Sequence, residues 1–292
     1  MGLFDSLRSL VTVEKRLNVE ARFELLREAV TGTMSSFHMA RDKKTREVFG
    51  LKVLDAEKTG HFEARFKGLH KPSEGEIAMA IVHPRVVKTL EFGTTTKGEP
   101  YILSEFLEGS VLSQMIMARD PALGENRLEL VRQMAEGVAA VHAAGFIHRD
   151  VCPRNFIVSP DAASLKLIDF GLTLPMKKEF MQPGNRTGTP TYLAPEIARR
   201  RPTDHRVDIF SLGVSVYYLL SFDFPWPSHE ATGKVALRHD TQPPTDLREA
   251  LPGVNERLAA AVMRCISISA DDRFASAEQF LTAIRAVDSV LS

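Results

Sequence analysis

Short apolar runs with turn-forming residues between them dominate the first third of the chain. Five of these runs read as strands, namely residues 23–30, 36–40, 47–54, 86–92 and 101–107. Between the third and fourth runs, Ser73 and Glu76 form the Ser-x-x-Glu pattern of a capping box, which predicts a helix over residues 73–82. This part of the chain is therefore expected to form an antiparallel sheet with one helix.

The hydrophobic period changes in the second part of the chain. Apolar residues recur every three or four positions from Asn126, which can cap the start of a helix, to Gly145, which can end it. Residues 207–220 are apolar almost all round, as in a helix buried inside a large lobe. The last predicted helix has an apolar face that reaches nearly to the terminus: Phe280, Leu281, Ile284 and Val287. The change of period predicts two lobes in an α+β fold.

The first 21 residues are expected to form a helical extension. Its apolar residues share one helical face, which favours packing on the rest of the domain. The alternative is membrane attachment, because the start of the chain fits the N-myristoylation pattern with Gly2 and Ser6.

Composition limits the possible partners and compartments. The chain has 37 basic and 37 acidic residues, so it has no global positive field that would attract nucleic acid. No apolar run approaches the roughly 20 residues that a membrane-spanning helix needs. The two cysteines, Cys152 and Cys265, are far apart and lack metal-ligand spacing, which suits a reducing compartment. The expected location is the cytoplasm.

One series of polar residues has the chemistry that phosphoryl transfer requires. Asp150, within His148-Arg149-Asp150, is followed five residues later by Asn155, and Asp169 begins Asp-Phe-Gly 14 residues beyond that. Phosphoryl transfer needs a held triphosphate, Mg²⁺ to neutralise its charge and a hydroxyl placed in line. These three oxygen-bearing side chains could converge near a metal-bound phosphate.

This ordered series resembles the signature of the eukaryotic-like (Hanks-type) protein kinases, and within them the serine/threonine kinase family. Ala-Pro-Glu follows at residues 194–196, residues 207–213 resemble the family's central helix, and Arg273 lies where its late arginine belongs. The resemblance covers about residues 22–290. It implies a bilobal protein-kinase fold, with a small antiparallel β lobe over about 22–106 and a larger, mainly helical lobe over about 107–290.

The resemblance also implies catalytic roles. Asp150 would accept the proton of the substrate hydroxyl, while Asn155 and Asp169 would hold Mg²⁺. Lys52 resembles the strand lysine that binds the α- and β-phosphates of ATP. Its partner would be Glu74, since Ile77 and Ile81 then face inward; Glu76 is the alternative.

Further positions of the nucleotide site follow from the alignment: Gly32, Phe37, Gly50, Ser104 as gatekeeper, Glu105, Leu107 and Ile157. Gly32 is the one glycine left in the phosphate-covering loop. Phe37 replaces a usual valine while Gly50 replaces a usual alanine, which predicts a repacked roof over adenine. The small Ser104 predicts tolerance of bulky ligands at the adenine site.

The catalytic loop departs from the usual serine/threonine pattern. Cys152 stands where a lysine is common, whereas Arg154 stands where many tyrosine kinases have an arginine and could supply the missing charge. The segment 188–193 resembles the serine/threonine pattern, with Thr189 near Asp150, and outweighs the tyrosine signal. Cys152 is expected to be a bystander thiol in an open cleft.

Other residues are expected to regulate or support the site. Arg149 suggests control by phosphorylation of the activation loop, with Thr187 as acceptor; the alternative is a basic segment without a switch. Glu196 and Arg273 would form a buried ion pair, and Asp208 is a further structural residue.

The prediction is an ATP-dependent serine/threonine protein kinase that uses Mg²⁺, with Mn²⁺ as the alternative ion, and acts on a protein substrate. The alternative is a pseudokinase that serves as a nucleotide-binding scaffold; the degenerate glycine loop favours it and the retained catalytic residues oppose it. Small-molecule kinases share the Asp-to-Asn spacing but lack the Gly-Thr-x-x-Tyr-x-Ala-Pro-Glu segment.

Overall fold

The chain forms two compact units in this computed structural model. The first comprises Met1–Met79 with Lys88–Phe106, and the second comprises Ala80–Val87 with Leu107–Ser292. The structure describes residues 16–27, 30–31, 34–183, 187–226 and 235–292. The expected N-terminal extension through residue 15 and the expected nucleotide contact at Gly32 therefore lie outside the described residues.

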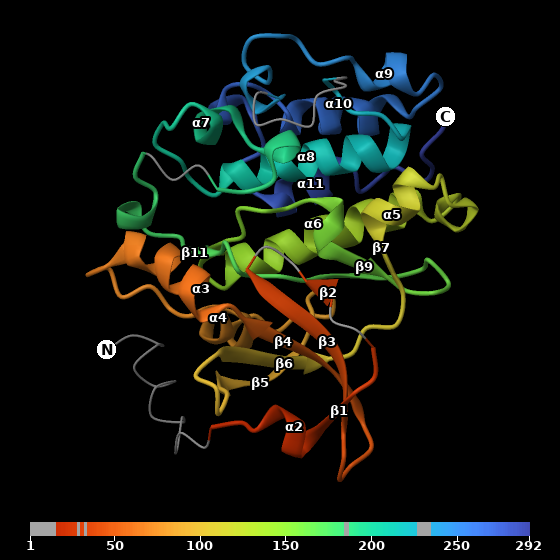
Figure 1. Cartoon of the computed structure of the whole chain (residues 1–292). Helices are drawn as coiled ribbons and strands as arrows, with labels where there is room; N and C mark the ends of the chain where they lie inside the picture. The colour runs from red at the N-terminus through yellow and green to blue at the C-terminus, as the bar shows by residue number, and fades with distance from the viewer. Residues whose placement is uncertain (1–15, 28–29, 32–33, 184–186, 227–234) are drawn as a thin grey trace. The chain divides into compact units, whose positions relative to one another are not determined.

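The elements follow the α+β order that the hydrophobic pattern predicts (Figure 1). The α-helices are α2 (Val19–Arg22), α3 (Ala56–Glu63), α4 (Glu74–Ala80), α5 (Leu112–Met117), α6 (Arg127–Ala143), α7 (Pro195–Ala198), α8 (Arg206–Ser221), α9 (Leu247–Ala250), α10 (Glu256–Cys265) and α11 (Ala277–Ala283). The strands are β1 (Phe23–Leu25), β2 (Val30–Thr31), β3 (Ser35–Asp42), β4 (Val48–Leu54), β5 (Thr89–Thr94), β6 (Pro100–Glu105), β7 (Ser110–Val111), β8 (Phe146–Ile147), β9 (Phe156–Val158), β10 (Leu165–Leu167) and β11 (Leu174–Pro175). Short 3₁₀ helices are η1 (Ala64–Phe66), η2 (Pro121–Leu123), η3 (Pro153–Asn155), η4 (Lys178–Phe180), η5 (Pro190–Tyr192), η6 (Val235–Leu237) and η7 (Ala270–Asp272).

An antiparallel sheet builds the first unit. Its strand order is β1-β3-β4-β6-β5, and β2 pairs with β3. The register sets Lys52 of β4 directly opposite Phe37 of β3 and Ile102 of β6. Residues on the other side of the strands form a buried cluster: Leu17, Phe23, Ala40, Leu51, Tyr101 and Leu103. The alternation of inward and outward residues thus places Lys52 on the face away from this cluster.

The first unit contains more than the one expected helix. Helix α3 was not predicted, because Ala56–Glu63 includes Gly60 and buries only Phe62, so it has almost no hydrophobic period. A start signal is nevertheless present in the sequence. The Asp55 carboxylate accepts hydrogen bonds from the backbone N–H groups of Glu57 and Lys58 at 3.1 and 3.0 Å, as an N-cap residue does.

Two of the expected strands differ from the structure by more than two residues at an end. The run 23–30 is divided into β1 and β2, and the run 86–92 becomes a strand only from Thr89. Residues 86 and 87 pair elsewhere, because the Val87 N–H donates to the Leu167 carbonyl at 3.0 Å within the second unit. This pairing explains why Ala80–Val87 belong to the second unit.

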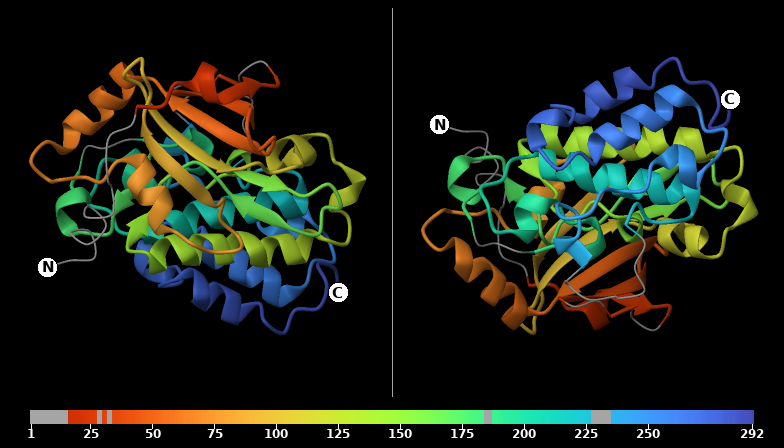
Figure 2. Two further views of the ribbon diagram at one scale, coloured as in Figure 1. Left: turned by 90° about the horizontal axis from the view of Figure 1, so that it is seen from below. Right: turned by 90° about the horizontal axis from the view of Figure 1, so that it is seen from above.

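Helix α8 is the centre of the second unit. All its residues after Arg206 are buried, as its almost uniformly apolar sequence predicts. It contacts α6 and α10, and α11 packs against α6 (Figure 2). Small antiparallel sheets, β7-β9-β10 and β8-β11, complete the unit. Of the helices in the described ranges, none combines the length and the apolarity that crossing a membrane would require.

The ends of three helices differ from expectation, and α4 ends at Ala80, two residues early. Asn126 precedes α6 but makes no side-chain capping bond, since its amide donates to the Ala122 carbonyl instead. Gly145 ends the helix as expected, with a left-handed φ of 83° and an N–H bond to the His142 carbonyl. Helix α11 ends at Ala283, although Ile284 and Val287 beyond it stay buried.

Candidate active site

Lys52 and Glu74 form an ion pair in the first unit. Lys52 Nζ lies 2.5 Å from Glu74 Oε1, and the two side chains are 17% and 9% exposed. Glu76 has another partner, because its carboxylate accepts from the Ser73 backbone N–H at 2.7 Å in the predicted capping box. Of the two candidate glutamates, Glu74 is therefore the one that contacts Lys52.

The other predicted nucleotide-site residues are divided between the two units. Phe37, Gly50 and Ser104 lie on β3, β4 and β6 of the first unit, where the Ser104 hydroxyl donates to the Gly50 carbonyl at 3.4 Å. Glu105 ends β6, and its N–H donates to the Lys88 carbonyl at 3.0 Å. Leu107 and Ile157 belong to the second unit, and Ile157 pairs with Val111 of β7.

The Asp150 carboxylate is held from two sides in the second unit. Its Oδ1 accepts hydrogen bonds from the Thr189 N–H at 2.8 Å and the Thr189 hydroxyl at 2.7 Å. Its Oδ2 accepts from Asn155 Nδ2 at 3.1 Å, and the same amide donates to the Asp150 carbonyl at 2.8 Å. These contacts fix the orientation of a carboxylate that is 12% exposed.

Arg154 brings a positive charge to the same carboxylate. Its Nη2 donates to the Thr189 hydroxyl at 3.0 Å and lies 3.6 Å from Asp150 Oδ2. Cys152, which stands at the usual lysine position, lies with its Sγ 3.8 Å from the Thr189 hydroxyl. Arg154 and Cys152 thus both lie at the Thr189 hydroxyl, and Arg154 is the one that brings a positive charge there.

Gly188 was not predicted as a site residue, yet it controls the approach of Thr189 to Asp150. Its φ is 121°, and an added Cβ would lie 2.8 Å from the Arg149 carbonyl oxygen. Only glycine combines this conformation with this close approach. The Gly-Thr-Pro sequence at 188–190 was the available signal for this role.

Asn155 and Asp169 have the donor atoms that a magnesium site needs. The Ile168 N–H donates to the Asn155 carbonyl at 2.8 Å, which ties the two segments together. Because Asn155 Nδ2 donates to Asp150, the amide oxygen of Asn155 is directed elsewhere. No cluster of three or more His, Cys, Asp or Glu in the described part of the chain could hold a metal by itself.

Asp208 of α8 anchors the loop that carries Asp150. Its carboxylate accepts from the backbone N–H groups of His148 and Arg149 at 2.7 and 2.8 Å, and it contacts His142 Nε2 at 2.9 Å. His142 was not predicted as a member of this network, because its place near the end of α6 was its one signal in the sequence.

The two residues expected to regulate the site are both enclosed. Arg149 is 4% exposed, and its burial lowers the pKa of its guanidinium to about 10. The Thr187 hydroxyl oxygen is buried as well, with no hydrogen-bond partner among the described residues.

A family model described as the protein kinase domain matches residues 23–283. The chain belongs to the protein kinase family. The serine/threonine-protein kinases pkn3 and pkn2 of Myxococcus xanthus are 33% and 31% identical to it, over 88% and 94% of the chain and 48% and 34% of their own lengths. The serine/threonine-protein kinase PknB of Mycobacterium tuberculosis strain H37Rv is 29% identical over 88% of the chain and 41% of its own length. The chain thus spans about half or less of these relatives.

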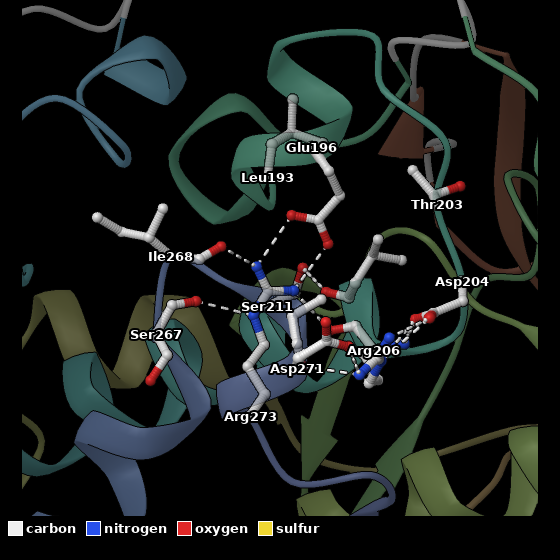
Figure 3. A network of polar contacts seen from close by, with 12 residues as sticks. Leu193, Glu196, Thr203, Asp204, Arg206, Ser211, Ser267, Ile268, Asp271 and Arg273 are labelled. Atoms are coloured by element: carbon white, nitrogen blue, oxygen red, sulfur yellow. Dashed lines mark hydrogen bonds and ion pairs between the residues drawn. The ribbon is translucent and has the colours of Figure 1, made fainter.

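The expected ion pair of Glu196 and Arg273 is present in this kinase domain (Figure 3). The Arg273 Nη1 and Nη2 donate to the two Glu196 carboxylate oxygens at 2.7 and 2.9 Å. Carbonyl oxygens of Ser267, Ile268 and Arg206 accept the remaining N–H groups at 2.9, 3.0 and 3.1 Å. All five donors of the buried guanidinium are therefore satisfied.

A cavity of about 340 Å³ lies beside this ion pair, in the second unit. It is lined by Pro195, Glu196, Arg201, Pro202, Thr203, Asp204, Arg206, Ile268, Ser269, Ala270 and Asp271. Arg206 bridges Asp204 and Asp271 at 2.8 Å each, so its charge is already balanced (Figure 3). Asp150, Asn155 and Asp169 do not line this cavity, which lies away from the expected chemistry.

The expectation of an accessible Cys152 is wrong. Its side chain is fully buried, and burial, with a smaller effect of Asp150, raises the pKa of the thiol to about 12. Cys265 is also fully buried, with its pKa raised by burial.

We predict that Ellman's reagent at pH 8 labels neither thiol in the folded protein and labels both after denaturation. Rapid reaction of one equivalent in the native state would contradict this.

We predict that Arg273→Lys destabilises the fold by about 3 kcal/mol, because a lysine cannot satisfy both oxygens of Glu196 and three carbonyls in the buried site. Urea unfolding measures the loss. Arg257→Lys, at an exposed arginine of α10, is the matched control and is expected to change stability by less than about 0.5 kcal/mol. Equal losses in the two variants would show that the Arg273 network contributes no specific stability.

Proposed function

We propose that this protein kinase transfers the γ-phosphate of ATP to serine and threonine hydroxyls of protein substrates. The observation that carries the proposal is the constrained Asp150 carboxylate, with Asn155, Thr189 and Arg154 around it. A carboxylate fixed in this way suits the residue that accepts the proton of an attacking hydroxyl. The relatives named serine/threonine-protein kinases support the choice of acceptor.

In this proposal, the chain's own residues share the work of the transfer. Asp150 orients the substrate hydroxyl and receives its proton, while the hydroxyl oxygen bonds to the γ-phosphorus. The bond between that phosphorus and the β–γ bridging oxygen breaks, and this oxygen leaves with ADP. Lys52, held by Glu74, binds the α- and β-phosphates. Arg154 places a positive charge where negative charge develops during transfer.

The metal in this proposal is Mg²⁺, held by the side-chain oxygens of Asn155 and Asp169 together with ATP phosphates; Mn²⁺ is the alternative ion. When bound, the ion neutralises phosphate charge. Oxygen donors from one amide and one carboxylate suit either ion.

Regulation at Thr187 is a further part of the proposal. A phosphate on this residue would offer a counter-charge for the buried Arg149 guanidinium. Since the Thr187 hydroxyl is buried in the described conformation, its phosphorylation requires the segment to open first.

We also propose a cytoplasmic location for this domain. Two unpaired, buried cysteines support it, because they suit a reducing compartment. Attachment through a myristoylated Gly2 stays an expectation from the sequence.

The first experiment compares the protein with Asp150→Asn in a radiolabelled-ATP assay on a general acceptor protein. We expect phosphoserine and phosphothreonine in the acceptor, and a loss of roughly a thousandfold or more in kcat for the variant, because the amide cannot accept the proton. Retained ADP binding and an unchanged melting temperature control for folding. Equal incorporation by both proteins, or incorporation by neither, would favour the nucleotide-binding scaffold.

The role of Arg154 has its own test. We expect Arg154→Ala to lower kcat by roughly tenfold to a hundredfold with little change in the KM for ATP, and Arg154→Lys to retain part of the activity. The effect is smaller than that of a buried donor because the Arg154 side chain is 66% exposed. Arg257→Ala is the control and is expected to leave turnover unchanged. Turnover within twofold of the unaltered protein in Arg154→Ala would exclude the proposed charge compensation.

A further inference from the structure

Four residues of the first unit project from one face of its sheet. Gly50 and Lys52 are two residues apart on β4 and so point to the same side. Phe37 of β3 is directly opposite Lys52, and Ser104 of β6 is directly opposite Gly50. Residues directly opposite in an antiparallel pair share a face. The face that carries Lys52, which we propose binds ATP phosphates, therefore also carries Phe37 and Ser104.

The ring of Phe37 is seated against the backbone of Gly50. A Cβ added at residue 50 would lie 2.8 Å from Phe37 Cζ, 3.0 Å from Phe37 Cε2 and 2.8 Å from Ser104 Oγ. The tip of the ring thus occupies the volume of a methyl group at position 50, next to the Ser104 hydroxyl. A glycine inside a strand often marks such a close approach. Phe37 is nevertheless 40% exposed, so much of its ring is uncovered.

We propose that Phe37 is the residue that determines which bases the nucleotide site accepts, with Gly50 as its required partner. This inference rests on the proposed function. The exposed part of the ring supplies a flat apolar surface on the ligand face, of the kind on which a purine can stack. The tip of the ring fills the space that the small Ser104 side chain would otherwise leave open.

This arrangement changes the expectation drawn from Ser104. A small gatekeeper alone predicts that bulky adenine-site ligands bind readily. The ring tip and Ser104 Oγ each lie 2.8 Å from the place of a residue-50 Cβ, however, so a large substituent that enters this space must first displace Phe37. The limit on ligand size is therefore set by Phe37 of β3. Replacing its ring with a smaller side chain should remove this limit.

The pairing also predicts the effect of changing Gly50. A methyl group there must push the Phe37 ring away, and we expect the ring to move toward the side where it is exposed. That movement brings it into the ligand's space. A smaller side chain at position 37 should cancel the effect, because the methyl group then has no ring to displace.

Calorimetric titration with Mg-ADP and with Mg-N⁶-benzyl-ADP tests the inference on four variants: Phe37→Val, Gly50→Ala, the double variant and Gly60→Ala. Gly60 is the control because an added Cβ there meets no atom within 4 Å. We expect Gly50→Ala to weaken ADP binding about tenfold, and the double variant to bind ADP within about threefold of Phe37→Val. We expect the unaltered protein and Gly60→Ala to bind the benzyl analogue at least about tenfold more weakly than ADP, and Phe37→Val to bind the two within about threefold.

Two results would overturn the inference while leaving the proposed kinase function intact. One is an additive effect of the two substitutions on ADP affinity. The other is benzyl-analogue binding by the unaltered protein as tight as its ADP binding. If Gly50→Ala failed to fold, Phe37→Val with the two ligands would still decide the matter. Failure of the unaltered protein to bind ADP would instead contradict the proposed function, and the inference with it.

Discussion

The geometry of the candidate site in the second unit depends on the hydrogen bonds to the buried carboxylate of Asp208. Burial alone would raise the pKa of Asp208, but the hydrogen bonds from His142 and from the Arg149 backbone outweigh it and hold the pKa below its ordinary value. The group is therefore ionised at neutral pH. It stabilises the fold above the ordinary pKa of aspartate, and this contribution is lost as the pH falls through the lowered value. Helix α8 thereby fixes the backbone just before Asp150.

That anchor allows the loop to keep a costly conformation. Arg149 has a φ of 68°, in the left-handed region that ordinary residues rarely adopt, and Asp169 has a φ of 67°. The Asp208 bond to the Arg149 N–H offsets the cost at the first position, and the Asp169 carboxylate accepts its own bond from the Gly171 N–H at 3.0 Å. The strain lies next to the residues expected to act on the phosphate, where a fixed backbone aids positioning.

The sequence predicted best where one physical rule dominates. The almost uniformly apolar sequence of α8 and the capping box at Ser73 led to the correct elements. In the structure the capping box occupies Glu76, and Glu74 is the partner of Lys52. Helix α3 escaped prediction because its one buried residue, Phe62, gives no period. The burial of Cys152 could not be predicted either. Whether a loop residue points inward depends on the distant segment that covers it, here the one carrying Thr189.

The two departures from the family pattern have the same physical form. On the sheet face that carries Lys52, volume missing at Gly50 is supplied by Phe37 from the neighbouring strand. In the loop that carries Asp150, the proposed function has the charge missing at Cys152 supplied two residues later by Arg154, which reaches the Thr189 hydroxyl. The second exchange also lowers an energetic cost, because a lysine at the fully buried position 152 would need its ammonium desolvated, whereas the Arg154 side chain is 66% exposed and stays hydrated while reaching Thr189. A volume or charge that a site needs can therefore be supplied from another position in the sequence, provided that it lies at the same place in the fold.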